Sequence, residues 1–383
     1  MQHVRYAVVG LGALGSATAY QLARGGADVL GFEQFELGHV RGASHDTSRI
    51  IRRCYELPEY VRLADAAYRD WADFEERSGE RLVTRTGGLV FCPPDGPRPV
   101  TAYANSLRAV GVDFEQLSAA QVHARWPQFA LPPGVETIHT ADTGIVHAAR
   151  SVAAWQMQAR AQGAELRDRC PVTALSYDGD LVVLDTASGR VSADQVILCT
   201  DAWTNKLLAP LGAAIPLRTM LEQVTYFAPG VGADFEQGAF PVWIWEDDPC
   251  YYGFPFFGEP TVKVARDVSN VLMDVDERSF VPSAERLAEL TAFVRGTLPT
   301  VGDPLRTITC QYSLTPDRHF VLGALPGHPQ LLVGLGAGHA FKFAPAIGRV
   351  LAELATTGAT TEDISLFGAA RQAVATPAAA LSP

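Results

Sequence analysis

A strand, a glycine turn, a helix and a second strand follow one another within the first 33 residues, and this order constrains the fold most. Residues 6–9 form a continuous apolar run, which is typical of a strand buried in a parallel sheet. Glycines at positions 10, 12 and 15 come next. Residues 16–24 are rich in Ala and Leu and predict a helix that ends at two further glycines. Residues 28–32 predict the second strand.

The glycine turn predicts a site for a dinucleotide. Gly10, Gly12 and Gly15 allow tight curvature and let backbone amides approach a pyrophosphate at the positive end of the helix dipole. Glu33 stands about 20 residues beyond, where a carboxylate can accept hydrogen bonds from ribose hydroxyls. The alternative is an ordinary glycine turn with a surface glutamate, and the full context favours the nucleotide. The carboxylate disfavours the 2′-phosphate of NADP, so NAD and FAD both remain open.

The rest of the chain alternates between segments that predict helices and parallel strands and segments that predict antiparallel strands. Caps or amphipathic periodicity predict further helices over residues 58–78, 145–162, 282–298 and 344–356. Short segments between Pro and Gly turns over 81–143, and aromatic-rich segments over 216–306, predict antiparallel strands. A meander over 172–189, which precedes a buried strand at 195–200, favours FAD over NAD. The glycine turn at 334–338 also favours FAD, because this cofactor lies extended across several strand ends.

This alternation indicates two domains that are interleaved in sequence. The predicted fold class is α/β (α+β overall). An FAD-binding, Rossmann-like domain is predicted for residues 1–80, 145–215 and 310–370. A substrate-binding domain with an antiparallel sheet is predicted for residues 81–144 and 216–309. Residues 371–383 are rich in Ala and Pro and predict a frayed tail.

The composition argues against several classes of partner. There are 31 basic and 42 acidic residues, a net charge of −11, and no block of Lys and Arg stands out, which disfavours nucleic acid. The six cysteines form no CxxC pair, so neither a disulfide framework nor a metal site is indicated, and a reducing cytoplasm fits. No apolar run approaches the roughly 18 residues that span a bilayer, and no leader is recognisable at the start.

Five motifs resemble those of a known family in the order expected for it. They are Ser48-Arg49-Ile50-Ile51-Arg52, Tyr251-Tyr252-Gly253-Phe254-Pro255, Val262-Lys263-Val264, Cys310-Gln311-Tyr312 and Gly338-His339-Ala340-Phe341-Lys342-Phe343. The chain is similar, from about residue 4 to about residue 367, to the monomeric sarcosine oxidase and N-methyltryptophan oxidase family. These flavoenzymes are related to D-amino acid oxidase. Five separate motifs in order are far more specific than any single one.

The resemblance implies an FAD cofactor that is attached covalently through a thioether between Cys310 and the flavin 8α-methyl group. A lone buried cysteine is otherwise most often inert, and the Cys-x-Tyr context with the other motifs favours the link. The cofactor contacts that it implies, together with the glycine turn, are Gly10, Gly12, Ala13, Leu14, Gly15, Glu33, Gln34, Ser44, Ser48, Val172, Trp203, Gly336, Gly338, His339 and Lys342.

The resemblance also implies three catalytic residues. Lys263 matches the lysine that holds a water near flavin N5 and promotes the reduction of oxygen, where a fixed cation stabilises superoxide. In a strand its side chain points away from the face of Val262 and Val264, which is equally compatible with a solvated lysine. Arg49 and His45 match positions beside the flavin ring, where a cation stabilises the anionic reduced flavin.

Four further residues match the substrate site of the family. Arg52 and Lys342 match the pair that binds the substrate carboxylate. Arg52 offers a guanidinium with forked donors, and Lys342 offers a point charge. Tyr252 and Tyr312 match aromatic residues that line the amine pocket, and ordinary core packing is an equal alternative for them. Two more aromatic residues either extend the pocket wall or belong to the core: Trp243 and Trp245.

Three departures from the family pattern bear on the substrate and the cofactor. Asp267 stands where the family often has His, four residues after the lysine. Residues 218–223 differ and are one residue longer. Asp201 stands where a Gly is common after the strand that meets the flavin. The first two put the identity of the substrate in doubt, and the third bears on the backbone beside the cofactor.

The sequence therefore predicts an FAD-dependent oxidase of secondary, N-methyl amino acids that gives an imine and hydrogen peroxide. Oxidation of cyclic imino acids such as pipecolate or proline, or of primary amino acids, is the alternative. More distant alternatives are an NAD-linked dehydrogenase and a flavoprotein without catalysis. The expected partners are a small amino acid and molecular oxygen, with no nucleic acid, metal or membrane, and a monomer in the cytoplasm is expected.

Overall fold

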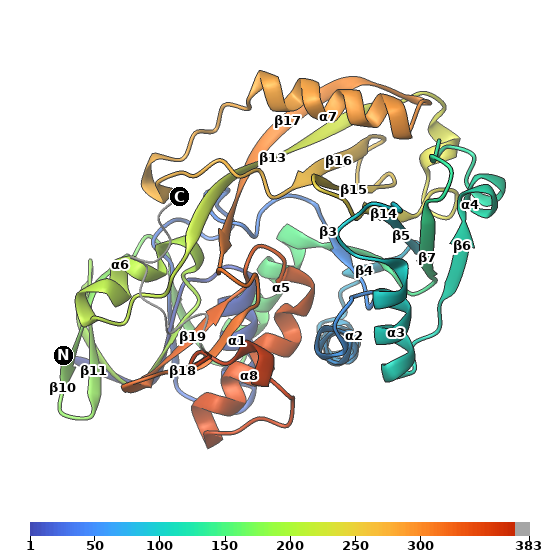
Figure 1. Cartoon of the computed structure of the whole chain (residues 1–383). Coiled ribbons are helices and arrows are strands. Elements are labelled where there is room, and N and C mark those ends of the chain that lie inside the picture. The colour runs from blue at the N-terminus through green and yellow to red at the C-terminus, as the bar shows by residue number, and fades with distance from the viewer. Residues whose placement is uncertain (372–383) are drawn as a thin grey trace.

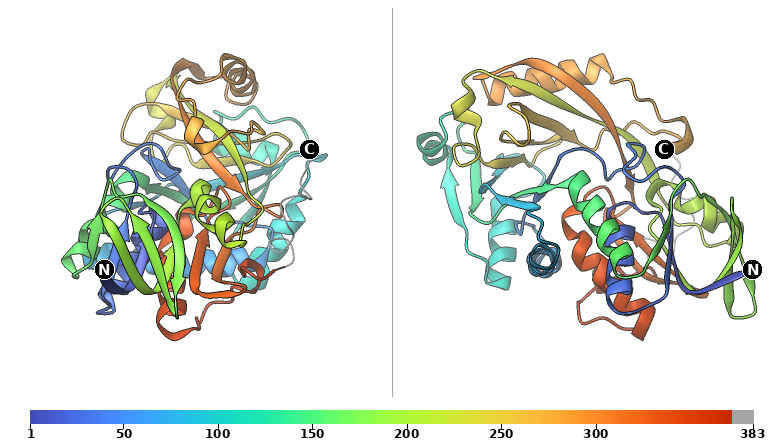
Figure 2. Two further views of the ribbon diagram at one scale, coloured as in Figure 1. Left: turned by 90° about the vertical axis from the view of Figure 1, so that its left-hand side faces the viewer. Right: turned by 180° about the vertical axis from the view of Figure 1, so that it is seen from behind.

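The computed structural model of this chain describes residues 1–371. The tail predicted after Arg371 falls in residues 372–383, which lie outside the described residues. Two eight-stranded sheets dominate the fold, and the chain passes between them several times (Figures 1 and 2). Among residues 1–371, no helix is long and apolar enough to cross a membrane.

The first sheet forms around the apolar strand that opens the chain. β1 (Gln2–Val9) pairs in parallel with β2 (Val29–Phe32) on one side and with β12 (Gly189–Leu198) on the other. β9 (Glu165–Arg167) extends the sheet beyond β2, and β19 (His328–Leu335) pairs in parallel with the end of β12. Because both faces are covered, these strands are continuous apolar runs rather than alternating ones.

Three antiparallel strands complete the first sheet. β10 (Val172–Asp178) and β11 (Leu181–Thr186) form the predicted meander against the first half of β12, and β18 (Val321–Leu325) pairs with β19. The strand expected at 195–200 is therefore longer toward its start and ends two residues earlier, at Leu198. Cys199 and the residues after it form the turn that follows β12.

Helices cover one face of this sheet. α1 (Ala13–Arg24) lies between α5 (Ala148–Ala161) and α8 (Ala344–Thr357), and a glycine permits the close approach of α8. A Cβ atom at Gly348 would lie 2.7 Å from the backbone of Ala17. α2 (Pro58–Ser78) packs on α8 and ends at Gly79 (φ +72°), as its sequence predicts.

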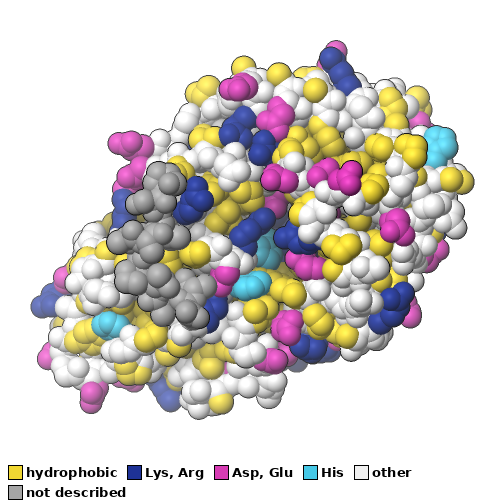
Figure 3. Space-filling model, viewed as in Figure 1, with side chains coloured by type: hydrophobic (Ala, Val, Ile, Leu, Met, Phe, Trp, Pro, Cys, Tyr) yellow, Lys and Arg dark blue, Asp and Glu magenta, His cyan; other side chains and the backbone are white. Residues whose placement is uncertain are grey.

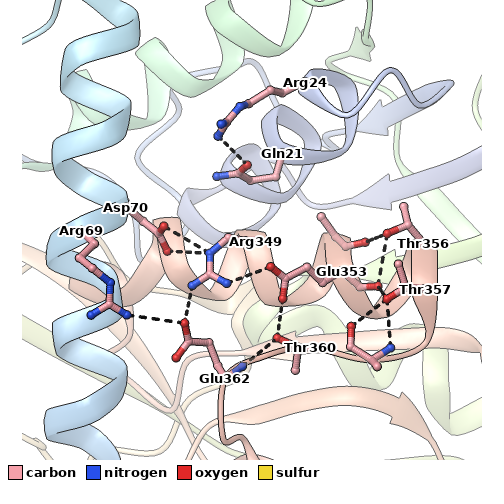
Figure 4. Close-up of polar contacts among 12 residues, drawn as sticks. Gln21, Arg24, Arg69, Asp70, Arg349, Glu353, Thr356, Thr357, Thr360 and Glu362 are labelled. Atoms are coloured by element: carbon pink, nitrogen blue, oxygen red, sulfur yellow. Dashed lines mark hydrogen bonds and ion pairs between the residues drawn. The ribbon is translucent and has the colours of Figure 1, made fainter.

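An ion-pair network links α2 to α8 (Figure 4). Arg349 of α8 binds the Asp70 carboxylate of α2 at 3.1 Å, and its other nitrogens bind Glu353 and Glu362 at 2.9 and 2.6 Å. The network is half-buried, so it fixes the register of these helices with less screening than exposed pairs experience.

The second sheet has the strand order β17-β13-β16-β15-β14-β5-β7-β6. The bounds are β17 Val301–Leu314, β13 Arg218–Pro229, β16 Val262–Asp267, β15 Cys250–Phe254, β14 Val242–Trp245, β5 Gly88–Cys92, β7 Glu136–Thr140 and β6 Glu115–Ser118. All neighbours are antiparallel except β14 and β5, which are parallel. α7 (Ala284–Thr297) packs on this sheet through Leu290 and Val294, which join an aromatic core.

A three-stranded sheet lies between the two large sheets. It consists of β3 (Ser48–Ile51), β8 (Gly144–His147) and β4 (Val83–Arg85). The helix expected from residue 145 therefore begins only at Ala148, which corrects that prediction. Ile145 and Val146 are fully buried β-branched residues between two partner strands, and this pairing overrides the helical pattern that follows them.

Residues 81–143 also contain two helices where the sequence predicted only strands. They are α3 (Val100–Val110) and α4 (Ala119–Arg125). α4 begins with a capping box in which Ser118 Oγ accepts from the Gln121 amide and the Gln121 side chain accepts from the Ser118 amide. The Ser-x-x-Gln pattern that marks such a start is legible in the sequence.

Candidate cofactor and substrate site

A cavity of about 1060 Å³ runs from the glycine turn at the end of β1 to the inner face of the second sheet. Of the site residues predicted from the sequence, all except Gly15 line it. Basic, acidic and histidine side chains gather at a hollow in the surface between the two halves of the molecule (Figure 3). The structure therefore brings together residues that are far apart in the sequence, such as Arg49 and Lys342, which are 293 positions apart.

The glycine turn requires glycine at two positions for steric reasons. Gly10 has φ +88°, and a Cβ atom there would lie 2.5 Å from the Cys199 carbonyl oxygen. A Cβ atom at Gly15 would lie 1.8 Å from the Gly10 carbonyl oxygen. Gly10 thus lets the turn pass beside the end of β12, whereas Gly15 lets α1 pack on the turn, which explains why Gly15 does not face the cavity.

Glu33 is held in place at the end of β2 and keeps acceptor capacity. Its side chain is about 7% exposed, and its two oxygens accept from the backbone amides of Leu11 (2.9 Å) and Phe35 (3.2 Å). A carboxylate has about four lone-pair positions, so positions remain for the hydroxyls of a ribose. His39 Nε2 lies 3.4 Å from the same carboxylate.

Arg49 is a partly buried cation that is satisfied by backbone oxygens. Its guanidinium donates to the carbonyls of Ser48, Ala43 and His45, each at 2.8 Å. His45 is buried beside it, and burial together with the Arg49 charge lowers the pKa of His45 to about 3. The imidazole is therefore neutral near pH 7, and Arg49 is the member of this pair that carries positive charge. His45 Nε2 has no hydrogen-bond partner among the described residues.

Lys263 forms a buried ion pair that the sequence did not predict. Its Nζ lies 2.5 Å from Asp46 Oδ2 and also donates to Ser48 Oγ at 3.0 Å and to the Ser48 carbonyl at 3.2 Å. Asp46 also accepts from the Tyr226 hydroxyl at 2.5 Å. Burial alone would raise the pKa of Asp46, but the Lys263 ammonium and the Tyr226 hydrogen bond hold it below its usual range. Burial lowers the pKa of Lys263 to about 8.

Lys263 therefore lies on the cavity side of its strand rather than in solvent. Val262 and Val264 point the other way into an apolar core, as the alternation in β16 requires. No sequence motif marks Asp46, apart from its place next to His45. Asp46 adopts φ +78°, which aspartate tolerates better than most residues.

Cys310 is a buried free thiol on β17, opposite Glu222 of β13, and it lines the cavity. Its Sγ lies 3.8 Å from the Gln311 carbonyl. All six cysteines, which fall within residues 1–371, are free thiols. Cys310 and Tyr312 project from the same face of β17, since side chains two positions apart share a face.

Arg52 and Lys342 come together across the cavity. Arg52 packs over the Tyr55 ring at 4.3 Å, and its ion pair with Glu246 is long, at 3.8 Å. Within the described part of the chain, Arg52 Nη1 has no hydrogen-bond partner. Lys342 Nζ donates to the His339 carbonyl at 2.9 Å. Burial and the nearby charge of Arg52 lower the pKa of Lys342 to about 7, as expected for a lysine that lies close to a second cation.

The aromatic residues separate into two groups. Tyr252 and Tyr312 line the cavity. Trp243 and Trp245 are buried in the aromatic core of the second sheet, beside Phe293, so they belong to the core. Their strand alternates sides, and the residue between them, Ile244, is the one that reaches the cavity.

The three departures from the family pattern have structural explanations. Asp267 pairs with Arg318 at 2.9 Å, and both line the cavity. Residues 218–223 pair without interruption with Thr309–Leu314 of β17, so the longer segment is accommodated in a regular strand. Asp201 has φ +46°, a left-handed conformation that glycine adopts at least cost, which explains why glycine is common there. Arg318 and Glu246 had not been predicted as site residues.

Comparison with known proteins agrees with this geometry. Residues 5–354 match the family model described as FAD dependent oxidoreductase, and the chain belongs to this family. FAD is thereby favoured over NAD as the cofactor of the glycine turn, as the meander suggested.

Individual relatives confirm the resemblance seen in the motifs. The chain is 35% identical to the monomeric sarcosine oxidase of Streptomyces avermitilis, over 96% of this chain and 97% of that protein. It is 29% identical to the N-methyl-L-tryptophan oxidase of Escherichia coli O157:H7, over 95% and 98%. Among solved structures, NikD, an unusual amino acid oxidase essential for nikkomycin biosynthesis, superposes with a TM-score of 0.86 at 30% identity, over 96% and 98% of the chains.

The residues of the cavity fit an FAD molecule. The turn at Gly10 is bare of side chains where a pyrophosphate would approach, and Glu33 has acceptor positions for a ribose. Buried polar atoms that lack a partner in residues 1–371, such as His45 Nε2, are the kind that a ligand satisfies. Arg49, whose charge faces carbonyls rather than a carboxylate, is suited to an anionic flavin.

Proposed function

We propose that this protein is an FAD-dependent oxidase of secondary, N-methyl amino acids, and that it works as a monomer. The observation that carries the proposal is the pairing of Arg52 with Lys342, two partly buried cations in the same cavity as the glycine turn and Lys263. When bound, FAD supplies the acceptor for two electrons from the amine and passes them to oxygen, which becomes hydrogen peroxide. The protein supplies binding, orientation and charge.

Arg52 and Lys342 are proposed to bind the carboxylate of the substrate. Arg52 Nη1, which has no hydrogen-bond partner within residues 1–371, offers a charge-assisted hydrogen bond, and the guanidinium packs over the Tyr55 ring. A carboxylate between the two cations removes the repulsion that lowers the pKa of Lys342, so binding favours its protonated form. Recognition of the carboxylate fixes the position of the amine and of the C–H bond that is broken.

The pocket around the amine is proposed to bind it in its neutral form. Tyr252 and Tyr312 offer hydroxyl groups whose pKa values burial raises, so both stay protonated and are able to donate or accept a hydrogen bond. No side chain needs to act as a strong base if the amine enters unprotonated. Oxidation leaves an imine, which water hydrolyses to an amine and a carbonyl compound.

Lys263 is proposed to promote the reaction with oxygen. Its ammonium is fixed by Asp46 and Ser48, so it does not need to reorganise when negative charge develops on oxygen. Arg49, with its three carbonyl contacts, is proposed to stabilise the anionic reduced flavin, and the neutral His45 to accept or donate a hydrogen bond beside it.

The covalent attachment through Cys310 is part of the proposal. It is supported by the position of the thiol on the cavity face of β17 and by the motif that surrounds it. We propose further that the interleaved segments 1–80, 145–215 and 310–370 bind FAD, while 81–144 and 216–309 bind the substrate.

A peroxide assay over a panel of amines tests the proposal. The panel is sarcosine, N-methyltryptophan, proline, pipecolate and primary amino acids, and the matched control is sarcosine methyl ester, which has the same amine but no carboxylate. We expect peroxide from N-methyl amino acids and a large loss with the ester. Faster oxidation of proline or pipecolate would assign the enzyme to cyclic imino acids instead. Absence of peroxide with every secondary amino acid would contradict the proposal.

A further inference from the structure

A short segment between β16 and α7 contacts both halves of the cofactor site. It contains the 3-10 helix η4 (Val275–Glu277) and then Arg278, an arginine that is only 8% exposed. Within η4, Asp276 forms an ion pair with Lys206 and accepts a hydrogen bond from Trp203 Nε1 at 3.0 Å. Trp203 and Lys206 follow β12 of the first sheet and line the cavity. The segment is therefore anchored to the first half of the molecule two residues before Arg278.

The Arg278 guanidinium binds two separate parts of the chain. Nη2 donates to the Thr309 carbonyl at 2.6 Å and to Thr309 Oγ1 at 3.3 Å, and this hydroxyl donates in turn to the Ser279 carbonyl at 3.1 Å. Nη1 donates to the Arg41 carbonyl at 2.7 Å, with the carbonyls of its two neighbours at 3.2 and 3.5 Å. Hydrogen bonds from a charged donor are stronger than those between neutral groups. The guanidinium is therefore a firm bridge between β17 and the loop around Arg41.

The two parts joined in this way carry the thiol and the cofactor turn. Thr309 directly precedes Cys310 on β17 of the second sheet. Residues 40–42 lead to Ser44, whose Oγ accepts a hydrogen bond from the Ala13 amide, at the start of α1, at 3.0 Å. The loop is thus attached to the end of the glycine turn. Through the bridge, the strand segment that carries the thiol is held at a fixed place relative to that turn.

Arg278 lies behind the wall of the cavity rather than in it. Within residues 1–371, the lining includes Cys310 and His45 but not Arg278. The guanidinium is nevertheless close to both, because burial and then the charges of Arg49 and Arg278 lower the pKa of His45. Burial lowers the pKa of Arg278 itself, and the Cys310 sulfur acts in the opposite sense. Arg278 is therefore suited to hold the thiol in place without touching the substrate.

We infer that Arg278 is a positioning residue, which bridges β17 and the loop at residues 40–42 and so places the Cys310 thiol against the 8α-methyl group of bound FAD. This inference rests on the proposed function, because it assumes FAD in the cavity and attachment through Cys310. In the attachment the S–H bond and one C–H bond of the methyl group break, and an S–C bond forms. The two protons and two electrons that are released reduce one oxygen molecule to hydrogen peroxide, by way of the flavin.

Attachment is sensitive to placement, because the sulfur must reach one particular carbon atom of the cofactor. A misplacement of about 1 Å slows a reaction between two bound groups by roughly 100-fold. Loss of the bridge leaves β17 without its hydrogen bonds to the loop. The glycine turn and Glu33 do not contact Arg278, so FAD should still bind while its attachment becomes slower.

Two substitutions and one control test the bridge. Arg278→Met keeps an apolar side chain of similar length and removes both sets of hydrogen bonds. Arg278→Lys keeps the positive charge but has one nitrogen in place of two, so it cannot keep every contact. The control is Arg349→Met, because Arg349 also joins two elements, α2 and α8, through its ion pairs. Arg349 and its partners are not among the cavity lining of residues 1–371.

Each full-length protein is produced under riboflavin limitation and then mixed with FAD in air without substrate. Total bound flavin is measured after gel filtration, and attached flavin is measured as the fraction that stays with acid-precipitated protein over time. Hydrogen peroxide is measured in parallel, with one molecule expected for each flavin attached. The melting temperature of each protein reports its stability separately.

We expect Arg278→Met to bind as much flavin as the wild type but to attach it roughly 10- to 100-fold more slowly. We expect Arg278→Lys to be slower than the wild type, and Arg349→Met to attach flavin at the wild-type rate despite a lower melting temperature. Attachment at the wild-type rate in Arg278→Met or in Arg278→Lys would overturn the inference. Equal slowing in Arg278→Met and Arg349→Met would also overturn it, because lower stability alone would then explain the effect.

A second pair of variants covers the case in which Arg278→Met does not fold. Thr309→Val removes the hydroxyl that contacts both Arg278 and Ser279 and keeps the shape of the side chain, whereas Thr309→Ser keeps the hydroxyl. We expect slower attachment in Thr309→Val and the wild-type rate in Thr309→Ser, and equal rates in the two would contradict the bridge. Wild-type protein that binds no FAD, or that never attaches it, would instead overturn the proposed function, so the two failures are distinct.

Discussion

Replacing Lys263 with methionine separates the structural and the chemical roles of its charge. The lysine is 4% exposed, and its ammonium has Asp46 and Ser48 as partners. Methionine keeps most of the volume and removes the cation, so Asp46 keeps only the Tyr226 hydrogen bond among the contacts described above. Breaking one side of a buried ion pair typically costs about 3–5 kcal/mol, and we expect a loss of this order in the free energy of unfolding.

The matched control removes both charges. In Lys263→Met/Asp46→Asn no buried carboxylate is left unpaired, so we expect the double variant to recover a large part of the lost stability. The reaction with oxygen should not recover, because the fixed cation is absent from both variants. Loss of one preorganised group that stabilises developing charge slows a step by roughly 100- to 1,000-fold, and we expect a decrease of this order in the rate of flavin reoxidation.

Two measurements distinguish these effects. Chemical denaturation gives the free energy of unfolding of the wild type, the two single variants Lys263→Met and Asp46→Asn, and the double variant. Stopped-flow mixing of reduced enzyme with oxygenated buffer gives the rate of flavin reoxidation. Reoxidation at the wild-type rate in Lys263→Met, or recovery of that rate in the double variant, would refute the role of Lys263. Equal stability of the single and double variants would refute the energetic importance of its pair with Asp46.

Three further predictions concern the carboxylate site and the glycine turn. Arg52→Lys removes the planar guanidinium with its forked donors. We expect the KM of N-methyl amino acids to rise by roughly 10- to 100-fold, equivalent to about 1.5–3 kcal/mol for a charged hydrogen bond. An unchanged KM in steady-state assays would place the carboxylate elsewhere. The pKa of Lys342 is lowered to about 7, so its positive charge is lost as the pH rises through 7. We therefore expect a simple carboxylate such as propionate to inhibit less above that pH, and we expect Lys342→Met to abolish this pH dependence. Gly10→Ala places a Cβ atom 2.5 Å from the Cys199 oxygen at φ +88°, and we expect purified protein with little or no flavin; normal flavin content in its absorbance spectrum would contradict the assignment of the turn.

Much of the first sheet followed from local sequence. The strands at the N-terminus, the glycine turn and the helix ended by Gly79 each have signals within a few residues, and the structure confirms them. The helix expected at residue 145 began too early because Ile145 and Val146 pair with strands from elsewhere in the chain. A local pattern does not contain such partners, and tertiary contacts override it.

Residues of the candidate site were predictable from the sequence where a motif contains them. They were not predictable where their role depends on a contact with a residue far away in the sequence. Lys263 was found from its motif, whereas Asp46, 217 positions away, became recognisable only when the fold brought the carboxylate to the ammonium. Trp243 and Trp245 were undecided in the sequence, because the alternation of β14 was visible but the side that faces the cavity was not. Arg318 and Glu246 likewise carry no local signal for their pairs with Asp267 and Arg52.

An anaerobic titration of the purified holoenzyme with an N-methyl amino acid tests the proposed chemistry most directly. We expect a yellow protein whose oxidised-flavin absorbance disappears as substrate is added and returns on exposure to air, with one hydrogen peroxide formed for each flavin reoxidised. A colourless preparation, or a yellow one that no secondary amino acid bleaches, would contradict the assignment of this cavity as the site of a flavin-dependent amine oxidase.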